Sequence, residues 1–301
     1  MQIIDEYMGR LMPDRAWERG LHQMIETKEE CPLGHRQETL ARISYQRFFR
    51  RYLHLSGMTG TAWEVAGELW SVYRLGVVRI PTNRPLRRRG MPDRLYAAAG
   101  EKWRAIVDAI STMRQQGRPV LVGTRTVGVS EHLSRLLIEG GIPHQVLNAR
   151  QDEEEAAIIA GAGEAGRITV ATNMAGRGTD ICLAPGVAES GGLHVITTER
   201  HEAHRIDRQL FGRCGRQGDP GTCQAIVSLE DELVTAHTGR SWISLVRFMA
   251  HPKSQISGWA GRVVFHVAQR RVERLHARAR QAVLKMDEQI DSALAFAGRP
   301  E

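Results

Sequence analysis

Short apolar runs rich in β-branched residues alternate with longer amphipathic segments over residues 101–229. Runs typical of buried strands lie at residues 119–124, 145–148, 168–172, 193–197 and 224–229. Segments with helical spacing lie at residues 101–116, 129–139, 152–162 and 201–211. Strands that alternate with helices pair in parallel, and the helices bury both faces of the sheet. The pattern therefore predicts an α/β fold with a parallel sheet and helices on both faces.

A glycine-rich turn follows the predicted strand at residues 168–172. It reads Thr172-Asn173-Met174-Ala175-Gly176-Arg177-Gly178-Thr179-Asp180-Ile181 and is called the glycine turn below. Glycines let backbone N–H groups approach a phosphate closely. Arg177 and Asp180 stand in this turn, where they could meet a phosphate and a ribose. The glycine turn is therefore a candidate nucleotide-binding segment.

A second glycine-rich segment, residues 209–221, carries two arginines and is called the arginine stretch. Arg213 and Arg216 stand three residues apart in it. Arginine forks match phosphate oxygens and stabilise the charge that develops in phosphoryl transfer. Ligands of open α/β sheets bind at the carboxyl ends of the strands, and we expect both segments there, with Gly123, Thr124 and Asn148. Two such segments in this order predict the second lobe of a two-lobed nucleotide motor.

The sequences of both segments resemble those of the SecA family, the ATP-driven motor that pushes preproteins through the bacterial Sec channel. The family pattern TNMAGRGTDI stands unchanged in the glycine turn. The pattern QLRGRSGRQGDPG stands in the arginine stretch, with Phe211 for arginine and Cys214 for serine. The resemblance covers nearly all of the chain and implies a RecA-like fold of the P-loop NTPase and helicase type. It implies that Arg213 and Arg216 are catalytic and face the γ-phosphate of ATP. Nucleotide binding is implied for Gly176, Arg177, Gly178, Thr179, Asp180 and Gln209.

Two features of the first third of the chain carry further predictions. Aromatic residues at helical spacing predict a helix over residues 39–55 with a core stripe of Phe48, Phe49, Tyr52 and Leu55. Residues 56–62 form, on their chemistry alone, only a tight turn. They resemble the family's GMTGTA, a helicase-type motif III that links the nucleotide state to lobe movement. The resemblance implies this coupling role for Gly57, Thr59, Gly60 and Thr61.

The middle of the chain predicts a crossover between two lobes. Residues 77–83 are predicted to be extended, because prolines nearby exclude a helix. They resemble the family's VVVPTNRP linker between motor lobes. The arginine run at residues 87–89 predicts a solvated surface. The domains predicted are the end of the first motor lobe (1–77), the second RecA-like motor lobe (78–235) and a helical scaffold segment (236–301).

Residues 259–295 predict one long arginine-rich helix at the end of the chain. The segment resembles the start of the family's helical scaffold. Two interpretations stay open: a scaffold that carries movement from the lobes to the polypeptide path, and an amphipathic helix docked on its own domain. Its basic face could also approach an anionic membrane surface.

The first residues and the missing motifs bear on catalysis. Asp5 and Glu6 follow a short apolar run, as in a Walker B strand, where an aspartate holds Mg²⁺ and a glutamate activates water. The resemblance argues against that role, because the family's metal-binding acids lie upstream of this segment. The 301 residues contain no GxxxxGK[ST] phosphate cradle. The resemblance therefore implies a central fragment that uses ATP and Mg²⁺ together with a missing N-terminal motor half, supplied in trans.

Composition limits the partners and the compartment. The net charge of +7 fits nucleic acid, anionic lipid or acidic partners, but aromatic RNA-binding signatures are absent and no specific nucleic acid is expected. Four cysteines without a CxxC pair predict neither a disulfide framework nor a zinc site. No long apolar run and no signal core occur, so neither a transmembrane helix nor a secretory signal is expected.

These features favour part of a SecA-type ATPase that acts in preprotein export. As the resemblance implies, its partners would be the Sec translocation channel and unfolded preproteins, and its location the cytoplasm and the periphery of the inner membrane. Two alternatives stay open. One is a non-catalytic interaction module derived from a translocase, and the other is a lobe of a superfamily-2 nucleic-acid helicase.

Overall fold

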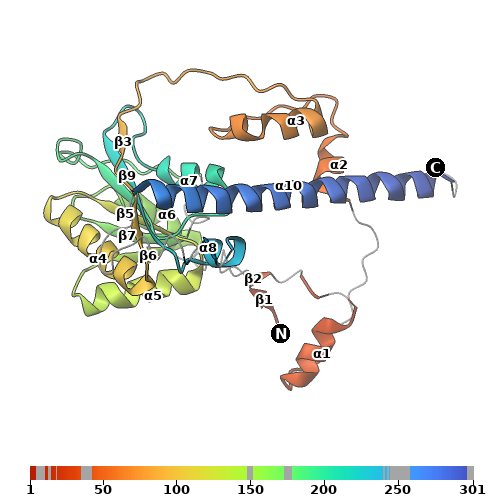
Figure 1. Cartoon of the computed structure of the whole chain (residues 1–301), viewed down its shortest axis with the longest axis horizontal. Coiled ribbons are helices and arrows are strands. Elements are labelled where there is room, and N and C mark those ends of the chain that lie inside the picture. Colours follow the sequence, from red (N-terminus) through yellow and green to blue (C-terminus); the bar gives the residue numbers. More distant parts are fainter. Residues whose placement is uncertain are drawn as a thin grey trace. The chain divides into compact units, whose positions relative to one another are not determined.

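The computed structural model of the chain (Figure 1) consists of two compact units. It describes residues 1–4, 11–12, 15–17, 19–34, 43–147, 152–172, 178–239, 241–242, 244 and 258–296. The larger unit comprises residues 2–16 and 82–269, and the smaller unit comprises residues 1, 17–81 and 270–301. The predicted sheet and both predicted phosphate-facing segments belong to the larger unit.

A parallel sheet forms the centre of the larger unit. Its strands are β3 (Arg88–Gly90), β4 (Arg94–Tyr96), β5 (Val120–Thr124), β6 (Gln145–Leu147), β7 (Ile168–Thr172), β8 (Leu193–Thr197) and β9 (Gly221–Ser228). They follow the order β3-β9-β8-β5-β7-β6, β4 also pairs with β9, and these pairings are parallel. A separate antiparallel pair joins β1 (Ile3–Ile4) to β2 (Leu11–Met12). The predicted parallel α/β sheet is confirmed.

Helices cover both faces of the sheet, as the sequence predicts (Figure 1). They are α4 (Ala99–Gln115), α5 (Val127–Glu139), α6 (Asp152–Gly161), α7 (His204–Phe211), α8 (Glu232–His237) and the first part of α10 (Gly258–Phe296). Successive side chains of β5 enter two different cores, because they point to opposite faces. Val120 and Val122 belong to the cluster that α4 and α5 cover. Leu121, between them, packs in the cluster that holds Ile159 of α6 and Leu210 of α7.

The carboxyl ends of the strands hold only part of what the sequence predicts there. Gly123 and Thr124 do end β5, whereas Asn148 lies outside the described residues. The arginine stretch instead runs from α7 to Gly221, the first residue of β9, which pairs with Leu193, the first residue of β8. Its predicted location at the carboxyl ends is therefore wrong. The reason is that a helix between two parallel strands returns the chain to the edge where the next strand begins.

The smaller unit contains the last part of α10 and several shorter helices. These are α1 (Leu21–Lys28), α2 (Tyr45–Phe49), a 3₁₀ turn (Ala62–Val65) and α3 (Ala66–Tyr73). Arg280 of α10 donates from Nε and Nη2 to the two carboxylate oxygens of Glu68 on α3, at 2.6 and 2.8 Å. Such a two-pronged pair fixes direction as well as distance. The predicted long helix of residues 259–295 is confirmed as α10.

The aromatic segment of the smaller unit differs from its prediction. Within residues 43–55 the α-helix is only α2, and residues 39–42 lie outside the described residues. The rings of Phe48, Phe49 and Tyr52 contact one another, with centroids 5.4 to 6.2 Å apart. Their exposed fractions are nevertheless 41%, 38% and 54%, so the predicted core stripe is wrong. Because α2 ends before Tyr52, the stripe lacks the helix that would align it.

A buried histidine in β8 makes the larger unit sensitive to acid. The Nδ1 atom of His194 lies 2.6 Å from Oγ1 of Thr222, which also accepts a hydrogen bond from Arg118. Burial, with the nearby charges of Arg118 and Arg94, lowers the pKa of His194 from 6.5 to about 4. The folded chain therefore keeps this imidazole neutral at a pH where the unfolded chain protonates it.

We expect the stability of the chain to fall as the pH drops from His194's ordinary pKa toward its folded one. Between these two pKa values only the unfolded state binds the proton. The free energy of unfolding therefore falls by up to about 3 kcal/mol by the time the pH reaches the folded-state pKa of His194. The His194→Gln variant keeps a polar partner for Thr222 but does not titrate, so its unfolding free energy should depend less on pH. Urea unfolding across this range measures the difference, and parallel pH profiles for the two proteins would contradict the assignment.

Candidate nucleotide-facing site

The described end of the glycine turn meets the arginine stretch. Arg213 donates from Nη1 to the backbone oxygen of Thr179 at 3.2 Å. Arg216 donates from Nη1 to Oδ1 of Asp180 at 2.7 Å, and its Nε donates to the backbone oxygen of Gly212 at 2.9 Å. Two segments that lie more than thirty residues apart in the sequence thus form one basic site.

Residues 212–220 of the arginine stretch form a tight loop between α7 and β9, with three residues in left-handed backbone conformations. Gly215 and Gly218 have φ angles of 67° and 84°, and Gln217 between them has a φ of 52°. A Cβ atom at Gly215 would lie 2.7 Å from Cβ of Arg88, so glycine is required both by conformation and by space. The loop therefore presents its two arginines from a backbone with little freedom.

Two arginines that follow the predicted crossover, Arg84 and Arg88, donate hydrogen bonds to the backbone of this segment. Arg84 donates from Nη1 to the backbone oxygen of Gln217 at 2.9 Å, and Arg88 donates from Nη1 to the backbone oxygen of Phe211 at 3.1 Å. Arg87 and Arg89 are exposed, as the prediction of a solvated arginine run requires, but Arg88 is half-buried. The prediction is therefore wrong for Arg88, because β3 pairs with β9 and turns this side chain toward the loop.

The ion pair between Arg216 and Asp180 is open to solvent. The side chain of Arg216 is 38% exposed and that of Asp180 is 44% exposed. An exposed pair of this kind stabilises a protein by less than about 1 kcal/mol. A phosphate group carries more charge than Asp180 and suits the same planar fork. The site can therefore exchange an internal carboxylate for an external phosphate at little cost.

Cys214, between the two arginines, is a buried thiol that stays protonated. Burial raises the pKa of its thiol to about 12. The backbone oxygens of Phe211 and Thr222 both lie within reach of the single S–H hydrogen of the neutral thiol, with Sγ–O distances of 3.3 and 3.5 Å. A serine hydroxyl could make the same kind of bond, so the departure from the SecA wording at this position preserves the local structure.

The other predicted site residues fall into four groups. Gly178, in the described end of the glycine turn, has a φ angle of 89°. Gly176 and Arg177, like Asp5 and Glu6, lie outside the described residues. Gln209 is exposed on α7, one turn before the loop. The predicted coupling residues Gly57, Thr59, Gly60 and Thr61 all belong to the smaller unit. There Thr59 and Thr61 share a hydrogen bond between hydroxyls at 3.2 Å, as expected of a tight turn.

Sequence reasoning missed a buried charged cluster near the carboxyl ends of β8 and β9. Lys102 of α4 is 2% exposed, and its Nζ lies 2.7 Å from Oδ1 of Asp231 and 3.8 Å from Oε1 of Glu199. The ring of Trp103 lies 4.5 Å from the same ammonium group. Burial raises the pKa of Glu199, although Lys102 opposes the shift. The available signal was a lysine on the apolar stripe of the predicted helix at residues 101–116.

Comparison with known proteins identifies the family. Residues 85–187 and 184–252 match the SecA P-loop domain, and residues 3–70 match the SecA DEAD-like domain. These matches define a protein of the P-loop and DEAD-like domain class. The chain belongs to the SecA family.

Curated relatives agree with this assignment. Protein translocase subunit SecA 2 of Nitrosospira multiformis is 53% identical over 303 residues, which is 100% of this chain and 45% of that protein. Protein translocase subunit SecA 3 of Magnetococcus marinus is 51% identical over 100% of this chain and 46% of that protein. The chain thus spans less than half the length of these relatives.

One solved structure is similar to about half of the chain. A chain in the crystal structure of E. coli DEAD-box protein SrmB bound to regulator of ribonuclease activity A is 23% identical, with a TM-score of 0.39. That similarity covers 51% of this chain and 87% of the other, and at this level no property transfers. Within the described ranges, no helix combines the length and the apolar character needed to cross a membrane.

Proposed function

We propose that this chain supplies the second-lobe side of the ATP site in a SecA-type protein translocase. Arg213 and Arg216 then act on the γ-phosphate as arginine fingers, stabilising the charge of the transition state electrostatically. The observation that carries the proposal is the junction of the arginine stretch with Thr179 and Asp180. Its exposed ion pair provides a fork that an incoming phosphate can take over.

The described residues suit a phosphate better than a metal ion. The loop offers the guanidinium groups of Arg213 and Arg216, which are suitable ligands for phosphate oxygens. Within the described ranges there is no group of three or more histidine, cysteine, aspartate or glutamate side chains that could hold a metal. In the proposed function, another part of the motor binds Mg²⁺ and most of the ATP. Gly176, Arg177, Gly178 and Gln209 complete the nucleotide contacts of this lobe.

The wider assignment follows the relatives' names. Their shared designation as protein translocase subunits supports a role in protein translocation. In the proposed function the partners are the Sec channel and unfolded preproteins, and the location is the cytoplasm and the periphery of the inner membrane. We assign residues 1–77 to the first motor lobe, 78–235 to the second and 236–301 to the scaffold. In this assignment Gly57, Thr59, Gly60 and Thr61 couple the nucleotide state to lobe movement.

A chimera tests the proposed function. This chain replaces the segment that it matches in the Nitrosospira multiformis relative, and ATP hydrolysis is compared with that of the unaltered relative. We expect the chimera to hydrolyse ATP, because this chain would supply Arg213 and Arg216 in place of the segment that was removed. A folded chimera without ATPase activity, beside an active parent, would contradict the proposal and favour the non-catalytic interaction module.

A further inference from the structure

One polar side chain interrupts the buried stripe of α10. Val264, Phe265 and Ala268 pack inward from this helix, and Gln269 beside them is only 2% exposed. The Nε2 atom of Gln269 donates to the backbone oxygen of His201 and to Oδ2 of Asp207, both at 2.8 Å. Both hydrogens of the amide are therefore used, and both point to the amino end of α7.

Asp207 is the acceptor that fixes the first turn of α7. Its Oδ1 accepts from the backbone nitrogen of His201 at 3.0 Å and lies 2.7 Å from Nδ1 of the same residue. Burial alone would raise the pKa of Asp207, but the hydrogen bonds from His201 and the charge of Arg200 lower it overall. The buried carboxylate is therefore ionised at neutral pH, and each of its donors restrains the direction of α7.

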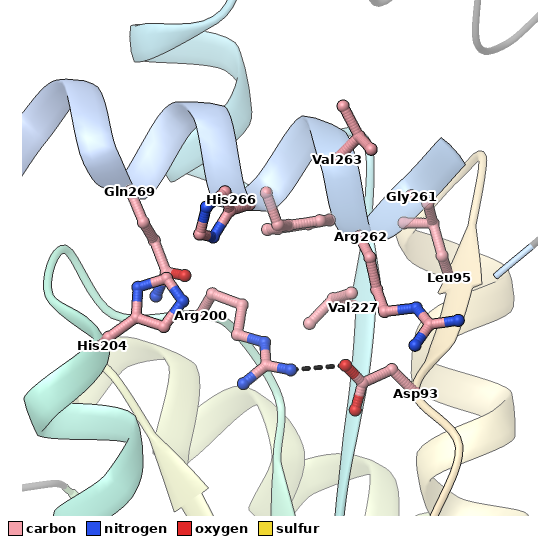
Figure 2. Close-up of a pocket in the computed structure, with 11 residues that line it drawn as sticks. Asp93, Leu95, Arg200, His204, Val227, Gly261, Arg262, Val263, His266 and Gln269 are labelled. Atoms are coloured by element: carbon pink, nitrogen blue, oxygen red, sulfur yellow. Dashed lines mark hydrogen bonds and ion pairs between the residues drawn. The ribbon is translucent and has the colours of Figure 1, made fainter. Parts of the chain in front are cut away.

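Arg200 connects the two ends of α7. It pairs with Asp93, as Figure 2 shows, and its Nη1 lies 3.4 Å from Oδ2 of Asp207. Its guanidinium also lies over the ring of Phe211, with Cζ 5.6 Å from the ring centroid. Phe211 is the last residue of α7 and directly precedes the loop that carries Arg213. The network thus reaches from Gln269 to the arginine stretch through a single short helix.

A pocket of about 430 Å³ that is open to solvent lies beside Gln269, between the first part of α10 and the sheet, with Leu95 and Val227 in its lining (Figure 2). Gln269 therefore lies at the margin of the packed contact between α10 and the sheet. Its two hydrogen bonds join α10 to the amino end of α7 at this margin.

We propose that Gln269 is a positioning residue that holds α7 and thereby sets the place of Arg213 and Arg216 opposite Asp180. This inference rests on the proposed function of the arginines. Since α7 is about 12 Å long, a tilt of a few degrees at its amino end moves its carboxyl end by about 1 Å. A misplacement of that size can lower a catalysed rate about 100-fold.

Hydrogen exchange of the 301-residue chain tests the positioning directly. The reporters are the amides of Gly212, Arg213 and Asp219, which donate to backbone oxygens of α7 and of the loop. In Gln269→Met we expect these amides to exchange about tenfold faster, because losing the hydrogen bonds to the backbone oxygen of His201 and to the carboxylate of Asp207 loosens α7. Amides of β5 and β7 should keep their rates. Gln281→Met, at an exposed position of the same helix, should change neither set.

Gln269→Asn is the second variant, because it keeps the amide but shortens its reach by one carbon. If the position of the side-chain amide matters, this variant should also speed the exchange of the Gly212, Arg213 and Asp219 amides. The proposal would be overturned by unchanged exchange in the loop or by equal acceleration of exchange in the sheet. Failure of both variants to fold would also overturn it, because the hydrogen bonds would then be a requirement of folding.

The chimera adds a functional measurement that separates the two claims. Gln269→Met in the chimera should lower kcat about tenfold or more and change the KM for ATP little, since Gln269 does not contact nucleotide. Loss of ATPase activity in the unmutated chimera would refute the proposed function, whereas the exchange experiment would still decide on Gln269. An unchanged kcat with loosened loop amides would overturn the positioning role.

Discussion

Replacing Arg213 by alanine in the chimera is expected to lower kcat for ATP hydrolysis by about 10³-fold, the usual effect of removing an arginine finger. Arg213 extends from a loop of restricted backbone and donates to the backbone oxygen of Thr179. The alanine variant removes the guanidinium but leaves the left-handed glycines, so the fold should survive. Steady-state kinetics at saturating ATP measure the loss.

Two further variants separate the shape of Arg213 from its charge. Arg213→Lys keeps a positive charge without the planar fork, so its kcat should fall between those of the parent and the alanine variant. Arg135→Ala removes an exposed arginine of α5 and should leave kcat unchanged. A kcat for Arg213→Ala within about twofold of the parent would rule out an arginine finger at this position.

Replacing Lys102 by methionine is expected to destabilise the chain by about 3–5 kcal/mol, because it leaves the buried carboxylate of Asp231 without its cation. Lys102 and Asp231 have side-chain exposures of 2% and 1%. Asp231 also accepts from the backbone nitrogen and hydroxyl of Ser228, so its carboxylate cannot turn away to solvent without breaking those bonds. Urea unfolding at neutral pH measures the change.

A double variant isolates the charge effect at this site. In Lys102→Met with Asp231→Asn no unpaired charge remains, so the loss should be smaller than the sum of the two single losses. Lys285→Met, at an exposed position of α10, should change stability by less than about 0.5 kcal/mol. Equal losses for Lys102→Met and Lys285→Met would show that the buried pair contributes nothing.

The alternation of strands and helices could be predicted because hydrophobic periodicity is local. The runs that enter both cores, such as residues 119–124, carry their signal within a few residues. β3 and β4 were missed because each has only three residues and contains arginine, which gives no strand signal. They are strands only because the backbone of β9 offers them a partner.

The candidate site could be predicted in its residues but not in its location. The glycine turn and the arginine stretch are recognisable as chemistry, and the structure does bring Asp180 to Arg216. The location of the arginine stretch at the edge where β9 begins depends on the direction in which α7 returns the chain. Gln269 and Lys102 carried little signal, because their partners lie 62 and 129 residues away in the sequence. Pairings of that kind depend on tertiary structure.

Equilibrium titration of the 301-residue chain with a fluorescent ATP analogue tests the central claim most directly. The account predicts weak binding that becomes about tenfold weaker or more in Arg216→Ala, because a charged fork to phosphate is lost. Arg135→Ala should bind like the parent. No binding, or equal affinity for the parent and Arg216→Ala, would contradict the claim that this site faces the phosphates of ATP.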